Sequence, residues 1–403
     1  MTVTIDPHIR QTRPWRQATR GGTKEDRTLT QIEVWVPPEI RDFDPVIPSR
    51  LGVQMDAALG AISRLDESHG GHLSPLSTLL LRAESVASSK IEHVEATVED
   101  YARALHGIQA NVSATSMVAS TRALDDLISS VGGAEDIELM NVLAAHKTLM
   151  ADDATELAYA GRVRDMQNWI GGSDFSPRGA LYIPPPAETV DDSLADLVTF
   201  ANRDDLNALV QAAVTHAQFE SIHPFTDGNG RIGRALINTV LRRRGVTQRV
   251  VVPLASALVA QREDYFGVLD SYRRGDAYPI IAAFSFASMI AAQESTVTAR
   301  RIATMPSEWL TAAARPRQGS AARRLIEYLL DEPIFSADEA ISRLSGPASS
   351  VYAALARLEG AGVISPLTKR TRNQVWGAGS LLTELSDLGL RIADRARLET
   401  HSE

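Results

Sequence analysis

The sequence predicts a mainly α-helical protein with a small helix-and-hairpin domain at its C-terminal end. Apolar residues recur at helical spacing, with few glycines between them, through most of the chain after residue 51. The residues after 320 show three helical patterns and then two short β-prone segments. With 403 residues, 44% hydrophobic and 23% charged, the chain is long enough for two or three compact globular units.

Each region has a pattern of its own. Residues 1–50 show no clear period and contain several prolines, which is typical of extended segments laid over a core. Residues 161–186 interrupt the helical pattern: glycine pairs and a triple proline flank the β-prone Leu181-Tyr182-Ile183, which predicts a hairpin or flap. The predicted helices before and after this flap are 51–65, 77–93, 95–105, 116–130, 136–149, 190–200, 206–219, 231–244 and 265–272.

The C-terminal region begins after a linker candidate that contains Arg315-Pro316-Arg317. Three helices and a β-hairpin around the charged turn 369–373 are the order of a winged helix-turn-helix domain. The predicted divisions are an extended segment at 1–50, a helical region at 51–160, a catalytic core at 161–298, a linker at 299–320 and the winged helix-turn-helix domain at 321–403.

Composition excludes several kinds of chemistry. The chain has no cysteine, which rules out disulfides, thiolate zinc sites, iron–sulfur clusters and a cysteine nucleophile. The N-terminus has no apolar stretch that reads as a secretory signal, and the apolar run 277–293 is short of a membrane span, so we expect a cytoplasmic protein without a membrane partner.

One segment carries most of the candidate chemistry, and it reads SIHPFTDGNGRIGR from Ser221 to Arg234. A helix ends before it and a Gly-Asn-Gly turn opens the next helix, whose unpaired backbone N–H groups and positive dipole end favour an anion. Gly228 and Gly230 would let phosphate oxygens come close to the backbone. Arg231 and Arg234 lie three residues apart, so both can reach one polyphosphate.

The same segment holds a candidate base and a candidate metal ligand. Asp227 offers the oxygen that holds Mg²⁺ when phosphates supply most of the other ligands. His223 has a reference pKa near neutrality, as a general base requires. Each feature alone is an ordinary cap, turn or solvated helix face, but together in a dozen residues they indicate chemistry on a phosphate compound.

This segment resembles the Fic family motif HPF-x-(D/E)-GNGR-x-x-R at every fixed position. The resemblance extends over about 51–289, and most known members transfer AMP from ATP to a hydroxyl of a target protein. It implies that His223 is the base on the target hydroxyl and that Asp227 is the Mg²⁺ ligand. The residues that it implies for ATP binding are Gly228, Asn229, Gly230, Arg231, Ile232, Gly233, Arg234 and Tyr265, with Arg234 towards the γ-phosphate.

The resemblance also implies a built-in inhibitor. The family motif (S/T)-x-x-x-E-(G/N) is similar to Ser88–His93, with histidine in place of the final Gly or Asn. In the family this glutamate, here Glu92, pairs with the second motif arginine, here Arg234. On a helix Ser88 and Glu92, four apart, would share one face. A carboxylate there would occupy the guanidinium that the γ-phosphate needs.

The flap and the C-terminal domain each predict a kind of binding partner. The flap, with Gly179, Ala180, Leu181 and Tyr182, would offer a strand edge to an extended segment of a target protein that carries a Tyr, Thr or Ser hydroxyl, or to the chain itself. The C-terminal domain has a net charge of only +2 from residue 300 onward, with Lys369, Arg370 and Arg372 in the wing, so DNA binding and dimer contact both stay open. Alternative functions are AMP removal, transfer of another nucleotide, or a DNA-binding regulator with a nucleotide-sensing core.

Overall fold

A computed structural model describes residues 2–18, 20–67, 73–108, 110–132, 135–368 and 374–400, and it confirms a mainly α-helical chain. The wing residues Lys369, Arg370 and Arg372 lie outside the described residues. In chain order the elements are β1 Ile9–Pro14, α1 Lys24–Thr28, β2 Gln31–Val36, α2 Ser49–Glu67, α3 Leu73–Ile91, α4 Val98–Leu105, α5 Val112–Ser129, α6 Leu139–Met150, η2 Ala187–Thr189, α7 Val190–Ala201, α8 Ala208–Ile222, α9 Asn229–Arg243, α10 Ala255–Ala260, α11 Arg262–Arg273, α12 Tyr278–Ala312, α13 Ala321–Tyr328, β3 Ile334–Ser336, α14 Ala337–Leu344, α15 Ala348–Gly360, β4 Ile364–Pro366, β5 Val375–Ala378 and α16 Gly379–Thr400.

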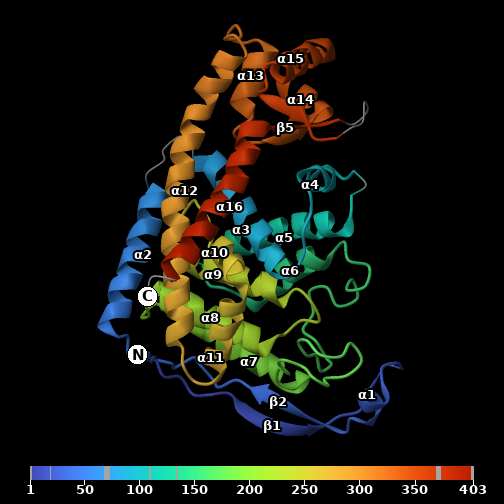
Figure 1. Cartoon of the computed structure of the whole chain (residues 1–403), viewed down its shortest axis with the longest axis vertical. Helices are drawn as coiled ribbons and strands as arrows, with labels where there is room; N and C mark the ends of the chain where they lie inside the picture. The colour runs from blue at the N-terminus through green and yellow to red at the C-terminus, as the bar shows by residue number, and fades with distance from the viewer. Residues whose placement is uncertain are drawn as a thin grey trace. The chain divides into compact units, whose positions relative to one another are not determined.

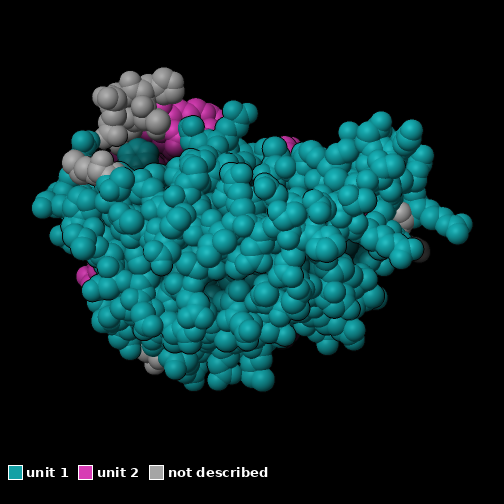
Figure 2. Space-filling view, turned by 90° about the horizontal axis from the view of Figure 1, so that it is seen from below, with its two compact units in different colours: residues 1–59, 122–246, 262–286 teal, residues 60–121, 247–261, 287–403 magenta. Residues whose placement is uncertain are grey.

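The chain forms two compact units whose residues alternate along the sequence. Unit 1 contains 1–59, 122–246 and 262–286, and unit 2 contains 60–121, 247–261 and 287–403. Figure 2 shows them in different colours, with a broad face of unit 1 toward the viewer. These units differ from the contiguous domains that the sequence predicts, because residues 60–121 pack with the C-terminal part of the chain.

Unit 1 is built around α8, a helix whose every residue is buried. It packs against α7, α9 and α11 (Figure 1). The Asn207 side chain caps its first turn by accepting the Leu209 N–H. Its polar residues are buried with the apolar ones, so the helix has no solvent face and forms the centre of the unit.

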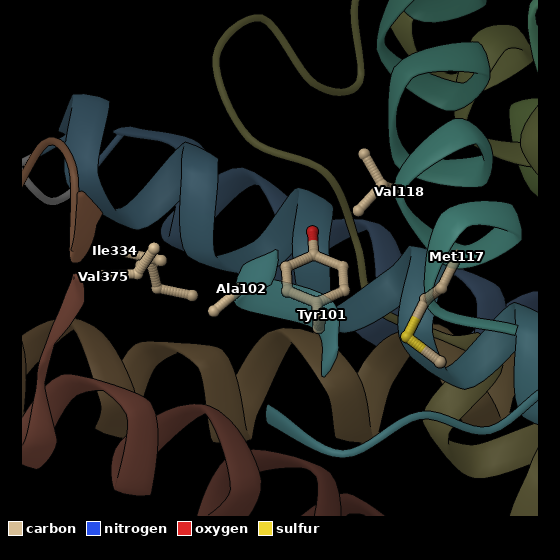
Figure 3. Packing of buried hydrophobic residues seen from close by; sticks show 6 residues of the cluster. All are labelled: Tyr101, Ala102, Met117, Val118, Ile334 and Val375. Atoms are coloured by element: carbon tan, nitrogen blue, oxygen red, sulfur yellow. The ribbon is translucent and has the colours of Figure 1, made fainter. Parts of the chain in front are cut away.

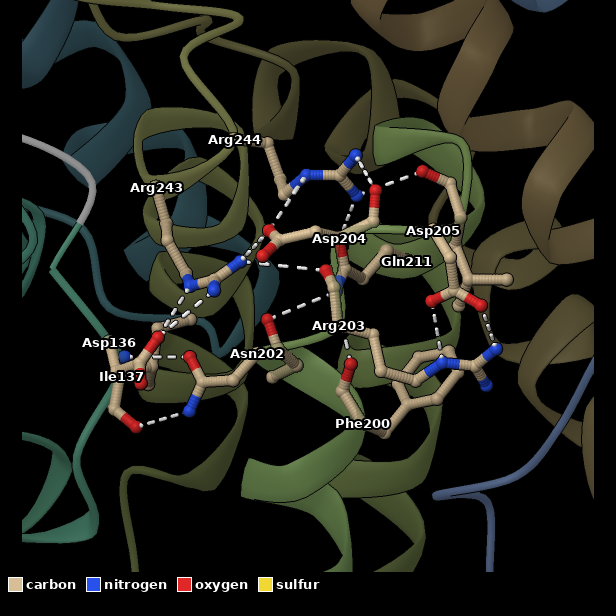
Figure 4. Close-up of polar contacts among 12 residues, drawn as sticks. Asp136, Ile137, Phe200, Asn202, Arg203, Asp204, Asp205, Gln211, Arg243 and Arg244 are labelled. Carbon is tan, nitrogen blue, oxygen red and sulfur yellow. Dashed lines mark hydrogen bonds and ion pairs between the residues drawn. The ribbon is translucent and has the colours of Figure 1, made fainter.

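The C-terminal end of α9 is tied to the turn between α7 and α8 by ion pairs. The Arg243 guanidinium lies 2.9 Å from Asp136 and 2.8 Å from Asp204, and Arg244 donates to the Gln211 side chain at 2.6 Å (Figure 4). The Gln211 amide in turn donates to the carbonyls that end α7. The network therefore fixes the ends of α8 and α9 that lie away from the loop joining these helices.

The N-terminal segment supports the predicted flap. Strands β1 and β2 pair as an antiparallel hairpin, and the Trp35 N–H of β2 donates to the flap carbonyl of Ile183 at 2.9 Å (Figure 1). The buried Asp26 accepts from the Ser176 hydroxyl at 2.7 Å and from Arg178. The hydrogen bond from Ser176 is the largest of the effects that hold the pKa of Asp26 below its usual range.

Unit 2 joins the helices before residue 121 to the C-terminal elements. Strands β3, β5 and β4 form an antiparallel sheet in that order, with α13, α14 and α15 beside it. Figure 3 shows Tyr101 and Ala102 of α4 between the strand residues on one side and the α5 residues on the other. The buried cluster consists of Tyr101, Ala102, Met117, Val118, Ile334 and Val375. This order of elements is compatible with a winged helix-turn-helix, which stays a prediction.

One sequence expectation changes in this region. Most of the predicted linker, 299–312, is the end of the 35-residue helix α12. Arg357 of α15 donates to the carbonyl of Ala313 at 2.6 Å and so satisfies an end that α12 leaves without helical partners. By length and composition α12 could cross a membrane, but 61% of its most apolar window is buried, as in core helices.

A buried histidine gives the fold a predicted pH dependence. The His8 ring lies edge-on to Tyr272, and burial lowers its pKa from 6.5 to about 3, with a smaller contribution from Arg273. The unfolded chain takes up this proton near pH 6.5, so the stability from neutral His8 is complete above that pH and is lost as the pH falls towards 3.

We expect the variant His8→Phe, which keeps a ring against Tyr272, to lose about 2 kcal/mol less unfolding free energy than the wild type between pH 8 and pH 5. Urea unfolding at the two pH values measures the difference. Equal losses in the two proteins would contradict the prediction.

Candidate functional site

The candidate site is the loop that joins α8 to α9 in unit 1. Helix α8 ends at Ile222, and His223 follows in the left-handed conformation with φ 50° and ψ 60°. Its N–H donates to the Phe219 carbonyl at 2.9 Å, which closes the helix. A left-handed residue other than glycine is uncommon and costs about 1–2 kcal/mol, so its surroundings must hold it in place.

Arg164 holds this strained backbone. Its guanidinium donates from Nε to the His223 carbonyl at 2.9 Å and from Nη2 to the carbonyls of Ile222 at 3.3 Å and Pro185 at 2.7 Å. The side chain is buried, and burial lowers the pKa of Arg164 to about 10. The five donors of an arginine thus satisfy carbonyls at the end of α8 that no helical N–H reaches.

The Gly-Asn-Gly turn is closed by its own side chain. Phe225 N–H donates to the Asn229 side-chain oxygen at 2.8 Å, and the Asn229 amide donates back to the Phe225 carbonyl at 2.8 Å. Asn229 therefore shapes the loop rather than facing a ligand. Gly228 has φ 77°, and a Cβ there would lie 2.4 Å from the Met150 methyl group, so only glycine fits.

A histidine of α6 packs against the loop. His146 stacks on Phe225 with ring centroids 3.7 Å apart, and its Nε2 lies 3.1 Å from the Asp227 carbonyl. Its Nδ1 accepts the Gly161 N–H at 3.0 Å, so Nε2 carries the proton. Burial lowers the pKa of His146 to about 4, which keeps the ring neutral near pH 7.

Asp227 is placed as a ligand for a phosphate-bound cation should be. Its side chain is 58% exposed, with Oδ1 accepting the Gly228 N–H at 2.6 Å and Oδ2 3.6 Å from Arg231. Among the described residues no group of three His, Asp or Glu side chains could hold a metal by itself. A single open carboxylate fits Mg²⁺ only when phosphate oxygens complete its shell.

The other predicted ATP-binding residues fall into two groups. Arg231 and Arg234 are both buried on the first turns of α9, as the spacing predicts. Ile232 is 1% exposed and belongs to the core, and a Cβ on Gly233 would lie 2.6 Å from Glu220 Oε1 of α8. These two residues therefore serve helix packing. Tyr265 is also buried, at 3% exposure, and its ATP-binding role stays a prediction.

The flap alternates between an anchor and an exposed residue. Ile170 and Tyr182 form an isolated bridge rather than a full hairpin. The Tyr182 hydroxyl donates to the Ser221 carbonyl at 2.7 Å, while Leu181 is 85% exposed. Tyr182, predicted among the docking residues, is thus a buried anchor. Gly179, Ala180 and Leu181 form the exposed turn of the flap.

The predicted inhibitory residues belong to unit 2. Helix α3 ends at Ile91, so Glu92 lies in the following turn rather than on the helix, while Ser88 is buried within α3. His93 has φ 59°, the left-handed conformation that follows many helices and favours Gly or Asn. His93 therefore departs from the family pattern in residue type but adopts the backbone shape that Gly or Asn would take.

Two supporting residues could not be found from the pattern. The Arg164 side chain donates to the carbonyl of His223, and the His146 ring bonds to the carbonyl of Asp227. These partners are far away in sequence, and the spacing of apolar residues carries no signal for such bonds. The nearest signal in the sequence is the stretch 161–168, which lacks helical periodicity and contains Arg164 and Asn168 among residues typical of turns. Asn168 donates to the Phe225 carbonyl at 2.9 Å.

Comparison with known proteins identifies the same segment. Residues 136–241 match the Fic/DOC family. Protein adenylyltransferase fic-1 of Caenorhabditis elegans is 29% identical over 151 residues, which is 36% of this chain and 26% of that protein. Probable protein adenylyltransferase aq_aa38 of Aquifex aeolicus is 33% identical over 104 residues, 26% of this chain and 30% of its own length. The chain thus spans about a quarter to a third of these relatives.

Solved structures share the fold. A Fic family protein from Desulfovibrio desulfuricans G20 has a TM-score of 0.52 at 22% identity and covers 83% of this chain and 96% of that one. Fic-1 residues 134–508 from C. elegans have a TM-score of 0.50 at 21% identity, with 62% of this chain and 72% of that one covered. At this identity the likeness concerns the fold alone.

The Arg164 clamp yields a stability prediction. In Arg164→Lys one ammonium nitrogen replaces a fork of donors, so buried carbonyls lose partners at about 1–3 kcal/mol each. We expect a loss of about 2–4 kcal/mol in urea unfolding. The control is Arg203→Lys, whose side chain also donates to carbonyls but pairs with an exposed Asp205, where water replaces lost bonds. Equal losses in the two variants would argue against the clamp.

Proposed function

The chain is a Fic/DOC family protein, and from that premise we propose that it is a protein adenylyltransferase, which transfers AMP from ATP to a hydroxyl side chain of a target protein. The observation that carries this proposal is the loop 223–234. It places a strained histidine at the end of a fully buried helix, an open carboxylate beside it and two arginines on the next helix. Arg164 and His146 hold that loop in place.

In the proposed reaction His223 acts as the base. It takes the proton of the target hydroxyl, whose oxygen then attacks the α-phosphorus of ATP while the bond to pyrophosphate breaks. Because the His223 carbonyl is held by Arg164, the ring starts from a fixed backbone position. A base held in this way accelerates the reaction more than a flexible base would, because it does not have to be ordered on the way to the transition state.

The chain's other residues handle charge. Negative charge develops on the departing pyrophosphate, and Arg231 and Arg234 supply buried guanidinium groups for it. Asp227 would hold Mg²⁺, which neutralises phosphate charge when bound. The partial positive charge at the start of α9 acts in the same direction, because its first N–H groups have no helical acceptor.

Substrate recognition in this proposal rests on the flap. The exposed Leu181, next to the anchored Tyr182, offers an apolar side chain to an extended segment, while the Leu181 N–H and the Tyr182 carbonyl already pair with Ile170 at 2.8 Å. The hydrogen bonds of Asp26 and Trp35 hold the flap from the N-terminal side. The target is therefore a protein that offers a Tyr, Thr or Ser hydroxyl in an extended segment.

Regulation in this proposal rests on Glu92. Glu92 is an exposed residue in the turn after α3, and the left-handed His93 redirects the chain directly after it. A carboxylate that pairs with Arg234 would keep the γ-phosphate of ATP from that guanidinium. Inhibition then depends on the conformation of this turn. The left-handed backbone at His93 carries a conformational free-energy cost that glycine would avoid and asparagine would reduce.

The base is tested by substitution. We expect His223→Ala and His223→Asn to lower AMP transfer by about 10²- to 10⁴-fold, with ATP binding retained. Asparagine tolerates the left-handed conformation better than alanine, so it separates loss of the base from loss of the loop shape. Intact mass after incubation with ATP and Mg²⁺ measures transfer, and near wild-type transfer by the asparagine variant would remove His223 from the role.

The inhibitory role is tested in the same assay. We expect Glu92→Gly to raise labelling by ATP at least several-fold, because the γ-phosphate regains Arg234. The control is Glu95→Gly, which removes a nearby exposed glutamate from the same segment. If both variants change labelling equally, or neither does, Glu92 is not the inhibitor.

A further inference from the structure

Arg234 is among the largest fully buried side chains of the protein, at 1% exposure. A buried guanidinium needs polar partners, since desolvation of an unpaired charge is very costly. One partner is the hydroxyl of Tyr265, 3.5 Å from Nη1, at the long end of hydrogen-bond distances. The same hydroxyl lies 2.9 Å from Nε2 of His216.

The donor inventory fixes the direction of the first of these hydrogen bonds. Arginine has no acceptor, so it donates to the Tyr265 oxygen. In the second hydrogen bond, the donor between the Tyr265 hydroxyl and Nε2 of His216 depends on the tautomer of the histidine. The result is a chain from Arg234 through Tyr265 to His216, in which each member limits the orientation of the next.

Three helices supply the chain, and their spacing is tightly fixed. His216 comes from α8, Arg234 from α9 and Tyr265 from α11. At Gly233, directly before Arg234, a Cβ would lie 3.3 Å from Nδ1 of His216 and 3.1 Å from the Phe219 ring. The His216 ring thus packs against the α9 backbone at the residue that precedes the arginine.

We propose that Tyr265 and His216 are positioning residues that set the place of the Arg234 guanidinium, and so set the preference for a nucleoside triphosphate over a diphosphate. The proposal rests on the proposed function, in which Arg234 reaches the γ-phosphate. Tyr265 acts through Arg234 because its hydroxyl lies between the guanidinium and His216. This positioning role differs from the contact with the nucleotide that the resemblance implies for Tyr265.

The test compares ATP with ADP in the full chain carrying Glu92→Gly, so that the glutamate does not compete. We expect Tyr265→Phe to weaken Mg²⁺–ATP binding about tenfold and to change ADP binding by less than about twofold, because only the third phosphate needs Arg234. Titration calorimetry measures both constants. In transfer assays the KM for ATP should rise more than kcat falls.

Tyr272→Phe is the matched control. Tyr272 lies on the same helix, is fully buried, and donates to the Gln218 side chain of α8 at 2.8 Å. Its substitution loses a buried hydroxyl of the same kind between the same two helices, but away from Arg234. We expect it to leave the ATP-to-ADP ratio unchanged, even if both variants lower the melting temperature.

A second variant tests whether the hydrogen bonds from Arg234 through Tyr265 to His216 act together or as independent contacts. His216→Phe removes the hydrogen-bond partner of the Tyr265 hydroxyl, and we expect it to weaken ATP binding as Tyr265→Phe does. The double variant should bind ATP no more weakly than Tyr265→Phe alone, because both changes break one chain. Additive losses would overturn the chain.

The remaining outcomes are also decisive. If Arg234→Lys abolishes the preference for ATP and Tyr265→Phe keeps it, or lowers ATP and ADP binding equally, the inference is wrong and the proposed function stands. If the chain binds ATP no better than ADP before any change at these positions, the assignment of Arg234 to the γ-phosphate fails, and the inference fails with it.

Discussion

The end of α8 is the constraint on which the candidate site depends. A helix buried on every side must end inside the protein, where its last carbonyls have no water to accept from. Arg164 supplies the missing donors, and the same bonds hold His223 in a left-handed conformation. The arginine therefore solves a problem of helix termination and fixes the proposed base in one arrangement.

The sequence predicted this region unevenly. Periodicity placed α7, α8, α9 and α11 within a few residues, and the motif brought together His223, Asp227 and the arginines, because these signals are local. The resemblance assigns Asn229 and Gly233 to ATP binding, which stays a prediction; in the structure Asn229 closes the loop and Gly233 lets two helices approach each other. Arg164, His146 and His216 were missed, since their partners lie on other helices and loops.

The limits of local sequence signals also explain why the predictions at the C-terminal end differ from the structure. Polar composition after residue 299 predicts a linker, but α12 continues to Ala312, with apolar residues such as Ile302 and Trp309 buried. Composition reports average polarity, whereas a helix needs only one apolar face to stay folded against its neighbours. Likewise His93 looked like a departure from a motif, although its backbone conformation is the one that the motif position favours.

The alternation of the two units along the sequence has a consequence for the order of synthesis. All residues of unit 1 have been synthesised once residue 286 is added, whereas Tyr101 and Met117 must wait for Ile334 and Val375, more than 200 residues later. Until then the apolar faces of α4 and α5 lack their final cover, and contacts over such separations form slowly. A nascent chain therefore completes the residues of the candidate site before it completes the core of the unit that contains Glu92.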